Sequence, residues 1–489
     1  MSSVGNSKGR LRAYWLGSVV CMGGFLFGYD SGIVGGVLTM DSFKRDYNYG
    51  SANQTRTNAL AVGLQQLGAF VGCFCAWPIT ARWGRKKSLL LFSLIFALGA
   101  VIQTINTGSL AAFYVARVIA GLGLGCATVV VPMYNSEMTP KELRGQIGSF
   151  FQFFYTIGIF TSYWIDYGVL FMSGDPTSQW QIPIGLQILP AAALGLGVLT
   201  VKESTRWLTK VGRHDEAWES LKWIRADESP AIVQEMEEIR LGVAYESRAT
   251  EGFHISELLQ SDNFKRVLAG FATMAAQQAT GATAFAYFGP QYFELLVGPG
   301  DQNLLLTAIF GAVKIAACGT FVLFLAARLT RRKVMVGGAV AMAACQITTA
   351  AVVKAKPPPE DAHVTSSGIA TVALIYLFVI IYNFSWGPMP WPYVSEIFPA
   401  RIREPGIAIS VASQWLFNFV FSLTTPYMMD SMKWGTFLLW GVFDVVIAIV
   451  AFFFLKETQG LSLEAIAQTE YKKGKRTETA RKADDEETS

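Results

Sequence analysis

Two ionisable residues, Asp30 and Arg117, fall inside long apolar stretches of the sequence. An ionised carboxylate within a membrane span costs about 2.5–3.5 kcal/mol on insertion scales, so Asp30 needs a cationic partner or a proton. Arg117 is the candidate partner, because a nearby guanidinium favours the charged carboxylate whereas burial disfavours it. A pair held in this balance can take up and release a proton. The alternative is a permanent buried salt bridge that holds two helices together.

Adjacent amide side chains, Gln277 and Gln278, lie one helical turn before Gly281. An amide group donates and accepts hydrogen bonds at once, so it suits a hydroxyl group that does both. The glycine lets a ligand or another helix approach closely. These residues favour binding of a polyhydroxylated molecule. The alternative is that the glutamines only bond neighbouring helices, which is common within membranes.

Chemistry that makes or breaks covalent bonds finds no support in the sequence. There is no nucleophile–base arrangement, no metal-ligand cluster and no nucleotide-binding loop. We therefore expect neither an enzyme nor a bound cofactor or metal. Lysines and arginines cluster in short loops rather than on one face, which argues against nucleic-acid binding.

The composition predicts where these polar residues must be held. Of the 489 residues 52% are hydrophobic and only 16% are charged, whereas a soluble protein carries about 25% charged residues. Apolar stretches of about 20 residues predict twelve membrane-spanning helices. The predicted fold is thus an all-α membrane protein. The spans are centred near Phe25, Leu67, Phe96, Leu122, Thr156, Leu194, Gln278, Val313, Ala343, Ile380, Trp415 and Val445.

The loops between the predicted spans differ in basic residues. The Arg82–Lys87 loop holds four basic residues and no acid, whereas the loops near Asn106, Gly174 and Gly300 hold no Lys or Arg. Because basic loops stay in the cytoplasm, both termini are predicted to be cytoplasmic. Asn53, which begins a glycosylation sequon, is then outside and is a candidate glycosylation site.

One long polar stretch divides the predicted spans into two sets of six. Within it, Ala217, Leu221 and Ile224 follow helical spacing, which predicts short amphipathic helices on the cytoplasmic side. The charged end of the chain is expected to be disordered. The predicted parts are the six-helix half 1–201, the helical linker 202–264, the second six-helix half 265–455 and the cytoplasmic tail 456–489.

Charged motifs of the first half recur about 250 residues later, as expected of two homologous halves. This organisation is typical of a rocking transporter whose site lies at the midplane between the halves. The matching segments are Arg82–Lys86 and Arg328–Arg332, Ser136–Arg144 and Ser395–Arg403, and Lys202–Ser204 and Lys456–Thr458.

These repeats place basic loops beside glutamates at predicted helix ends. Ion pairs there could latch the halves together when the transporter opens outward. The alternative is that they are topology signals and helix-end charges. A topology signal needs basic residues but no paired acids, which favours the latch. The candidate cytoplasmic gate residues are Arg82, Arg85, Glu137, Arg144, Glu203, Arg328, Arg331, Glu396, Arg403 and Glu457.

Seven motifs, in order, resemble the sugar porter family of the major facilitator superfamily, over about residues 17–464. Stretches such as Tyr163–Gly168 and Gly311–Lys314 look most like the fungal branch that includes quinate, galacturonate and hexose permeases. The seven motifs are Gly24–Asp30, Arg82–Lys86, Pro132–Gly145, Glu203–Leu208, Gln277–Gly281, Trp386–Trp391 and Glu457–Gly460.

The resemblance implies a central cavity between spans one, five, seven, ten and eleven. Its tryptophan would offer a flat apolar face to a sugar ring. Ile159 stands where some members of the family carry glutamine, and Thr283 stands where the family usually carries asparagine. We therefore do not assume an ordinary hexose specificity. The implied substrate-binding residues are Phe27, Gln152, Ile159, Gln277, Gln278, Thr283, Trp391 and Gln414.

The resemblance also implies proton coupling, because proton-coupled sugar porters have an Asp and an Arg at the positions of Asp30 and Arg117. We therefore predict alternating-access symport of a proton with a monosaccharide or sugar-like acid, such as a hexose, a pentose, galacturonate or quinate. The expected partners are this substrate, the proton and the lipid bilayer of the plasma membrane. The protein is expected to function as a monomer.

Two alternatives remain open. A passive sugar facilitator generally lacks the aspartate, and a non-transporting nutrient sensor usually carries a longer tail than this chain. Two further charged residues lie within spans. Lys314, in span eight, could attract an anionic substrate, snorkel to the interface or be structural. Asp444, in span twelve, has no assigned role.

Overall fold

Apolar runs of 20 residues and more dictate the architecture, because a backbone within lipid must satisfy its own hydrogen bonds, as a helix does. The computed structural model describes residues 7–140, 143–174, 176–325, 330–358, 365–455 and 457. Within these residues the regular structure is helical, with no strand.

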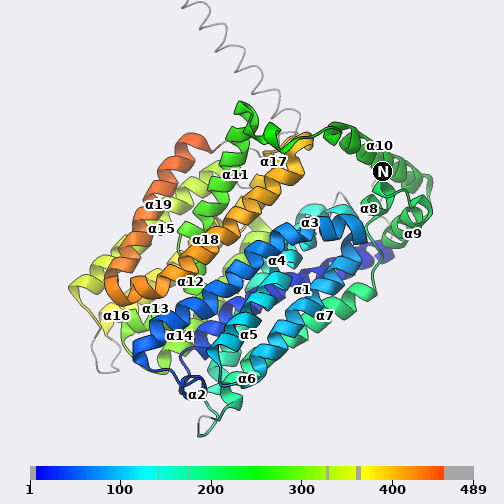
Figure 1. Cartoon of the computed structure of the whole chain (residues 1–489). Coiled ribbons are helices and arrows are strands. Elements are labelled where there is room, and N and C mark those ends of the chain that lie inside the picture. The colour runs from blue at the N-terminus through cyan, green and yellow to red at the C-terminus, as the bar shows by residue number, and fades with distance from the viewer. Residues whose placement is uncertain are drawn as a thin grey trace, which may run out of the picture.

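The helices form two halves joined by a helical linker (Figure 1). The first half contains α1 (Ser7–Val37), α2 (Asp41–Asp46), α3 (Ser51–Thr104), α4 (Leu110–Met138), α5 (Arg144–Val169), α6 (Ser178–Gly185) and α7 (Ile188–Leu199). The linker contains α8 (Thr205–Lys210), α9 (His214–Arg225), α10 (Pro230–Thr250) and the 3₁₀ turn η1 (Ile255–Leu259). The second half contains α11 (Ser261–Ala279), α12 (Ala282–Tyr287), α13 (Gly289–Val297), α14 (Gln302–Thr320), η2 (Phe321–Leu325), α15 (Arg331–Ala355), α16 (Ser366–Phe384), α17 (Pro390–Glu396), η3 (Ala400–Ile402), α18 (Arg403–Met432) and α19 (Trp434–Phe454).

The predicted twelve-span fold is confirmed. Nine helical segments in the described part of the chain are long and apolar enough to cross a membrane. One of them, α3, holds both the second and the third span, because its chain turns at Gly84. Helix α5 supplies the fifth span, and the interrupted series α11 to α13 supplies the seventh.

The turn inside α3 requires a glycine. Gly84 has φ +85°, a left-handed conformation that side chains with a Cβ rarely adopt. A Cβ there would also lie 2.4 Å from an Oε2 atom of Glu203. At the matching turn of the second half, Thr330 has φ −66° and ψ 129°, which any residue can adopt. The absence of glycine from the second basic loop therefore has a simple backbone explanation.

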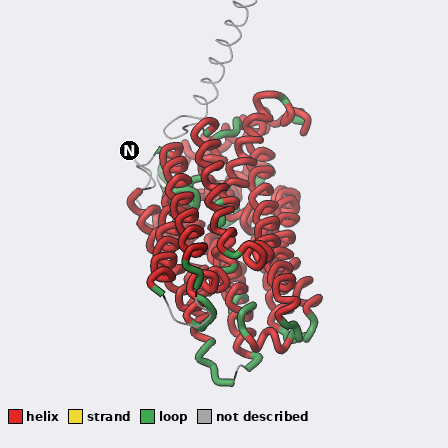
Figure 2. Tube along the Cα trace, turned by 90° about the vertical axis from the view of Figure 1, so that its left-hand side faces the viewer, coloured by secondary structure: helices red, strands yellow, loops and turns green. Residues whose placement is uncertain are grey.

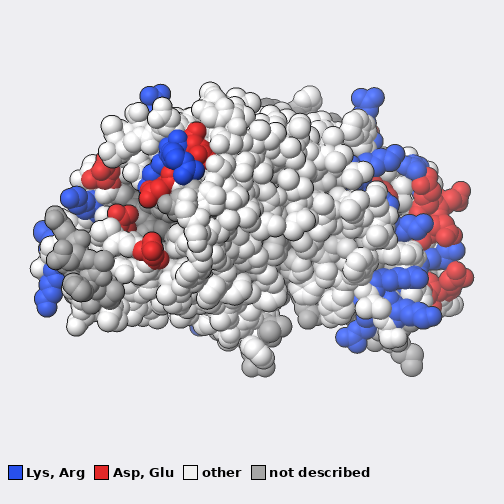
Figure 3. Space-filling view, turned by 90° about the horizontal axis from the view of Figure 1, so that it is seen from below, with Lys and Arg blue, Asp and Glu red and all other residues white. Residues whose placement is uncertain are grey.

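The long helices run between two ends of the bundle. We call the end that carries α8 to α10 the linker end and the opposite end, with α2 and α6, the far end (Figures 1 and 2). Seen from below in Figure 3, the surface has charged side chains at its two sides and a broad uncharged band between them. Such a band is what lipid contact requires.

The linker packs through the apolar faces that the sequence predicts. Ala217, Leu221 and Ile224 of α9 are buried. Arg225, also buried, donates to the carbonyl of Met138 at the end of α4 (2.9 Å), which fixes α9 to the first half. At its other end the linker meets the second half through an ion pair between Glu257 and Arg401. The linker therefore contacts both halves.

The two halves are in contact at the far end. The Tyr163 hydroxyl of α5 donates to the carbonyl of Ala286 in α12 (2.6 Å). Gln291 of α13 donates to the carbonyl of Gly35 in α1 (3.2 Å). A Cβ at Gly35 would lie 2.1 Å from the carbonyl oxygen of Tyr287. These close cross-half contacts seal the far end in this conformation.

Candidate functional site

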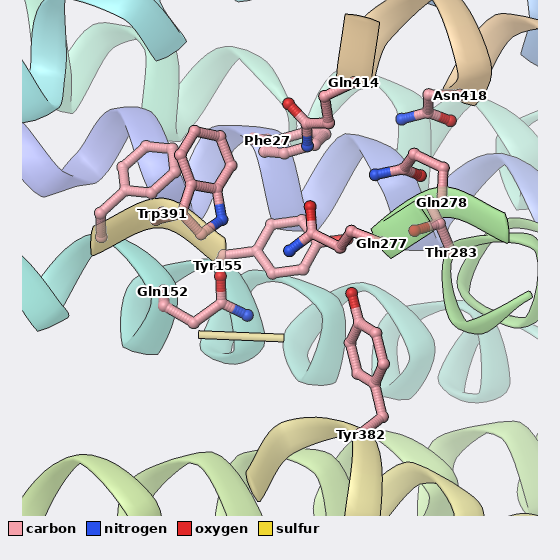
Figure 4. A pocket seen from close by; sticks show the side chains of 11 residues that line it. Phe27, Gln152, Tyr155, Gln277, Gln278, Thr283, Tyr382, Trp391, Gln414 and Asn418 are labelled. Carbon is pink, nitrogen blue, oxygen red and sulfur yellow. The ribbon is translucent and has the colours of Figure 1, made fainter. Parts of the chain in front are cut away.

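A central cavity lies between the two halves. It is lined from α1, α5, α11, α12, α16, α17 and α18, which correspond to the predicted spans one, five, seven, ten and eleven (Figure 4). The lining residues are Phe27, Phe151, Gln152, Tyr155, Gln277, Gln278, Thr283, Tyr382, Trp391, Gln414 and Asn418.

The structure brings seven of the eight predicted binding residues to this cavity; Ile159 is the exception. Ile159 is fully buried, and its backbone nitrogen packs against Gly28 of α1. Four lining residues were not predicted, namely Phe151, Tyr155, Tyr382 and Asn418. Helical spacing could have found two of them, because Tyr155 and Asn418 lie one turn after the predicted residues Gln152 and Gln414.

Breaks in two helices of the second half shape the cavity. Helix α11 ends before Gly281, whose φ of +80° turns the chain into α12. Helix α16 ends at Phe384, and α17 begins at Pro390. The Gln277 side-chain amide donates to the carbonyls of Trp386 (3.0 Å) and Gly387 (2.9 Å), so it satisfies backbone groups freed by the second break.

The oxygen atoms of three cavity amides accept no hydrogen bond from the described residues. These are the Oε1 atoms of Gln277, Gln278 and Gln414, and all three are buried. Leaving a buried acceptor unpaired is costly. A ligand with several hydroxyl donors would satisfy them, so this wall of the cavity suits a polyol (Figure 4).

Aromatic rings also line the cavity, and some of them bridge the halves. Phe27 of the first half lies 5.0 Å from Trp415 of the second, between ring centroids. Phe151 and Trp391 make a second such pair, at 6.1 Å, nearer the linker end. Flat apolar faces beside hydrogen-bonding groups match a sugar ring, which has apolar C–H faces and polar edges.

Asp30 and Arg117 lie together within the first half. Arg117 Nη1 is 2.8 Å from Asp30 Oδ1, and the two side chains are 0% and 1% exposed. Arg117 Nε donates to the carbonyl of Ala61 (2.8 Å), and the Gln65 amide donates to Asp30 Oδ2. The sequence did not identify Gln65, which belongs to α3. The pair is thus held by α1, α3 and α4.

Helix α1 links the buried pair to the cavity. Phe27 lines the cavity, and Asp30 follows it by almost one turn. The Ser31 hydroxyl donates to the Phe27 carbonyl (2.7 Å). Gly28 lets α1 pack directly on the backbone of α5 at Tyr155, another lining residue. A change in the hydrogen bonds of Asp30 can therefore shift groups that contact a bound ligand.

The charged motifs at the linker end form one network in each half. In the first, Arg85 of α3 pairs with Glu137 of α4 (2.7 Å), and the carboxylate of Glu203 accepts from the backbone nitrogen of Arg85 (2.9 Å). Burial raises the pKa of the Glu203 carboxyl, and hydrogen bonds from the backbone nitrogens of Ser204, Arg85 and Lys86 oppose that rise. Neither contact joins the first half to the second.

The second half repeats this arrangement. Arg331 of α15 pairs with Glu396 of α17, and Glu457 accepts from the backbone nitrogen of Arg331 (3.1 Å). Arg403 donates to the carbonyl of Phe398 (3.4 Å), and Arg82 is exposed. Arg328 and the side chain of Arg144 lie outside the described residues. The latch between halves therefore stays a prediction, for a state in which the linker end is closed.

The remaining predicted positions are spread over the fold. Asn53 is exposed in the first turn of α3 at the far end. Lys314 is buried in α14, and its Nζ lies 5.2 Å from the ring centroid of Tyr155. Asp444 is fully buried in α19, and neither carboxylate oxygen has a hydrogen-bond partner among the described residues. Asp444 is not among the residues that line the cavity.

Comparison with known proteins agrees with this geometry. The family model described as sugar (and other) transporter matches residues 16–469. The chain is 33% identical over 472 residues to a quinate permease of Emericella nidulans, covering 93% of this chain and 88% of that protein. It is also 33% identical to a probable quinate permease of Aspergillus niger, covering 93% and 87%.

Solved structures of a transporter also align with most of this chain. The proton:xylose symporter XylE, bound to 6-bromo-6-deoxy-D-glucose, aligns with a TM-score of 0.78 and 25% identity, covering 94% of this chain and 99% of that one. The inward-open conformation of XylE from E. coli aligns with a TM-score of 0.76 at 24% identity. The relatives are permeases and transporters, not enzymes.

Proposed function

Because the chain belongs to the sugar (and other) transporter family, we propose that it carries out proton-coupled symport of a monosaccharide or sugar-like acid. The observation that carries the proposal is the buried Asp30–Arg117 pair, one turn of α1 from the cavity. The names of the relatives support both parts of it. The two relatives of 33% identity are named a quinate permease and a probable quinate permease, and XylE is named a proton:xylose symporter.

The proposed coupling step is the protonation of Asp30. A proton on this carboxylate removes its attraction to Arg117, while Gln65 can still hydrogen-bond the neutral acid. Arg117 keeps its bond to the Ala61 carbonyl. The weakened contact between α1 and α4 then lets α1 move with Phe27 against the substrate. Substrate and proton together thus permit the change of access that neither permits alone.

The proposed orientation places the linker end in the cytoplasm and the far end outside the plasma membrane. The basic loops at the linker end and the exposed position of Asn53 at the far end support it. With the far end sealed, this conformation would exchange substrate with the cytoplasm. Both halves that surround the cavity belong to the same chain, so the proposed transport unit is a monomer.

Transport by Asp30→Asn in proteoliposomes tests the proposal. We expect the variant to lose pH-gradient-driven accumulation of quinate or xylose, while substrate exchange across the membrane continues. Asp41→Asn is the matched control, because Asp41 is exposed at the far end and should leave accumulation unchanged. Gradient-driven accumulation by Asp30→Asn at the wild-type level would refute proton coupling through this residue.

A further inference from the structure

A buried lysine lies beside the cavity without a described counter-ion. Lys314 is 2% exposed, so its ammonium group does not snorkel to the surface of the bundle. Its Nζ lies 5.2 Å from the ring centroid of Tyr155. Tyr155 lines the cavity, and its ring points into it (Figure 4). Lys314 is therefore behind one wall of the site that should hold the substrate.

The described acidic side chains do not neutralise this charge. Within the described residues Lys314 forms no salt bridge, and the buried carboxylate of Asp30 is paired with Arg117. A buried ammonium without a counter-ion is unfavourable, and contact with one aromatic ring offsets only part of that cost. Charged residues inside membrane proteins commonly serve as counter-ions for a ligand.

The cavity is also chemically asymmetric. One wall presents the unpaired amide oxygens of Gln277, Gln278 and Gln414, which accept from hydroxyl groups but repel a carboxylate. The Tyr155 wall has the positive charge of Lys314 behind it. A molecule with hydroxyl groups at one edge and a carboxylate at the other would satisfy both walls in a single orientation.

Building on the proposed function, we infer that Lys314 is a specificity-determining residue for an anionic substrate, a cyclic polyhydroxy acid whose carboxylate faces the Tyr155 wall. Helix α14, which carries Lys314, packs on α5 through Gly311 against Tyr163 and Phe160. The lysine is thus supplied by the second half to a wall built by the first. It attracts the carboxylate directly or across the edge of the ring, since a lysine stem is long and flexible.

Equilibrium binding to the purified full-length protein separates this role from a structural one. Quinate is the anionic probe and xylose the neutral one, and binding of each is followed by the intrinsic tryptophan fluorescence of the protein, which includes that of Trp391 in the cavity. Lys314→Met keeps the bulk of the side chain and removes a buried charge, so it should fold. We expect it to weaken quinate binding about 10- to 100-fold and to leave xylose binding within about twofold. Lys314→Arg should retain most of the quinate affinity.

Lys354→Met is the control, because Lys354 also contacts an aromatic ring, Trp434 at 4.4 Å, but that ring does not line the cavity, whereas Tyr155 does. It should change neither affinity. An equal loss of both ligands in Lys314→Met, or a wild-type protein that binds xylose but not quinate, would overturn the inference. Failure of the proposed symport would show instead as normal binding of both probes without gradient-driven uptake in the wild type.

Discussion

The two halves of this protein share one helical plan but differ in the chemistry at their centres. Each half has a network of arginine and glutamate at the linker end, made by Arg85 and Glu137 in the first and by Arg331 and Glu396 in the second. Among the described residues, only the first half places an ion pair, Asp30 with Arg117, within the membrane. Residues 276–289 lie 246 to 259 residues after Asp30, as the repeated motifs do, and they include no acidic residue.

The second half instead supplies four of the five amides of the cavity. Gln277, Gln278, Gln414 and Asn418 all belong to it, whereas the first half contributes Gln152 and three aromatic rings. The two halves thus share the same charged contacts at the linker end, but they carry different functional groups at their centres. In the proposed mechanism the first half binds the proton and the second half binds the hydroxyl groups. Proton binding in the first half must then be coupled to substrate binding in the second half across the cavity that lies between them.

The largest expected effect comes from splitting the buried pair. Arg117→Gln leaves Asp30 buried without its cation, which should cost about 3–5 kcal/mol of stability. The double variant Asp30→Asn/Arg117→Gln removes both charges, so it should recover much of that loss without recovering proton-driven uptake. Thermal unfolding in detergent and uptake in proteoliposomes measure the two effects. Equal destabilisation by the single and the double variant would contradict the pairing.

A second test compares the matching turns of the two halves. Gly84→Ala forces a Cβ into a left-handed conformation and against Glu203, and should cost about 1–3 kcal/mol. Thr330→Ala makes no such demand and should shift stability by less than about 0.5 kcal/mol. Melting temperatures of the two variants give the comparison. Equal decreases in the two melting temperatures would contradict the explanation that only the turn at Gly84 requires a glycine.

A smaller effect is expected in the cavity of the second half. Gln414→Leu removes one unpaired acceptor, so the KM for substrate exchange should rise about tenfold while the proton-to-substrate ratio stays unchanged. Gln346→Leu is the control, because Gln346 is a buried amide of the same half outside the cavity lining. A loss of proton coupling in Gln414→Leu would break the proposed division between the halves.

The smallest effect is expected for the ion pair between Glu257 of the linker and Arg401 of the second half. The Arg401 guanidinium beside Glu257 lowers the pKa of that carboxyl to about 2, from an ordinary 4.5. Between these values the unfolded chain binds more protons than the folded one, so the pair stabilises fully above about pH 4.5 and loses its contribution as the pH falls towards 2. Glu257→Gln should melt slightly below the wild type at pH 7 and converge with it as the pH falls to about 2. A difference that is independent of pH would argue against the ion pair.

Much of the fold follows from local properties of the sequence. Apolar length gives the spans, charge asymmetry gives a predicted orientation, and the spacing of Ala217, Leu221 and Ile224 gives the linker helix α9. The need of Asp30 for a partner follows from its position in an apolar run. Each of these is a property of a short segment in its solvent, so no knowledge of distant neighbours is required.

What the tertiary structure decided is which groups face one another. Gln65 joins the Asp30 pair, Tyr155 and Asn418 line the cavity, and Ile159 does not. The glutamates at the linker end bond within their own halves in this conformation. The sequence alone could not choose among such contacts, because many polar residues in helices offer the same hydrogen bonds. Only the crossing of α1, α5, α11 and α18 selects the atoms that meet.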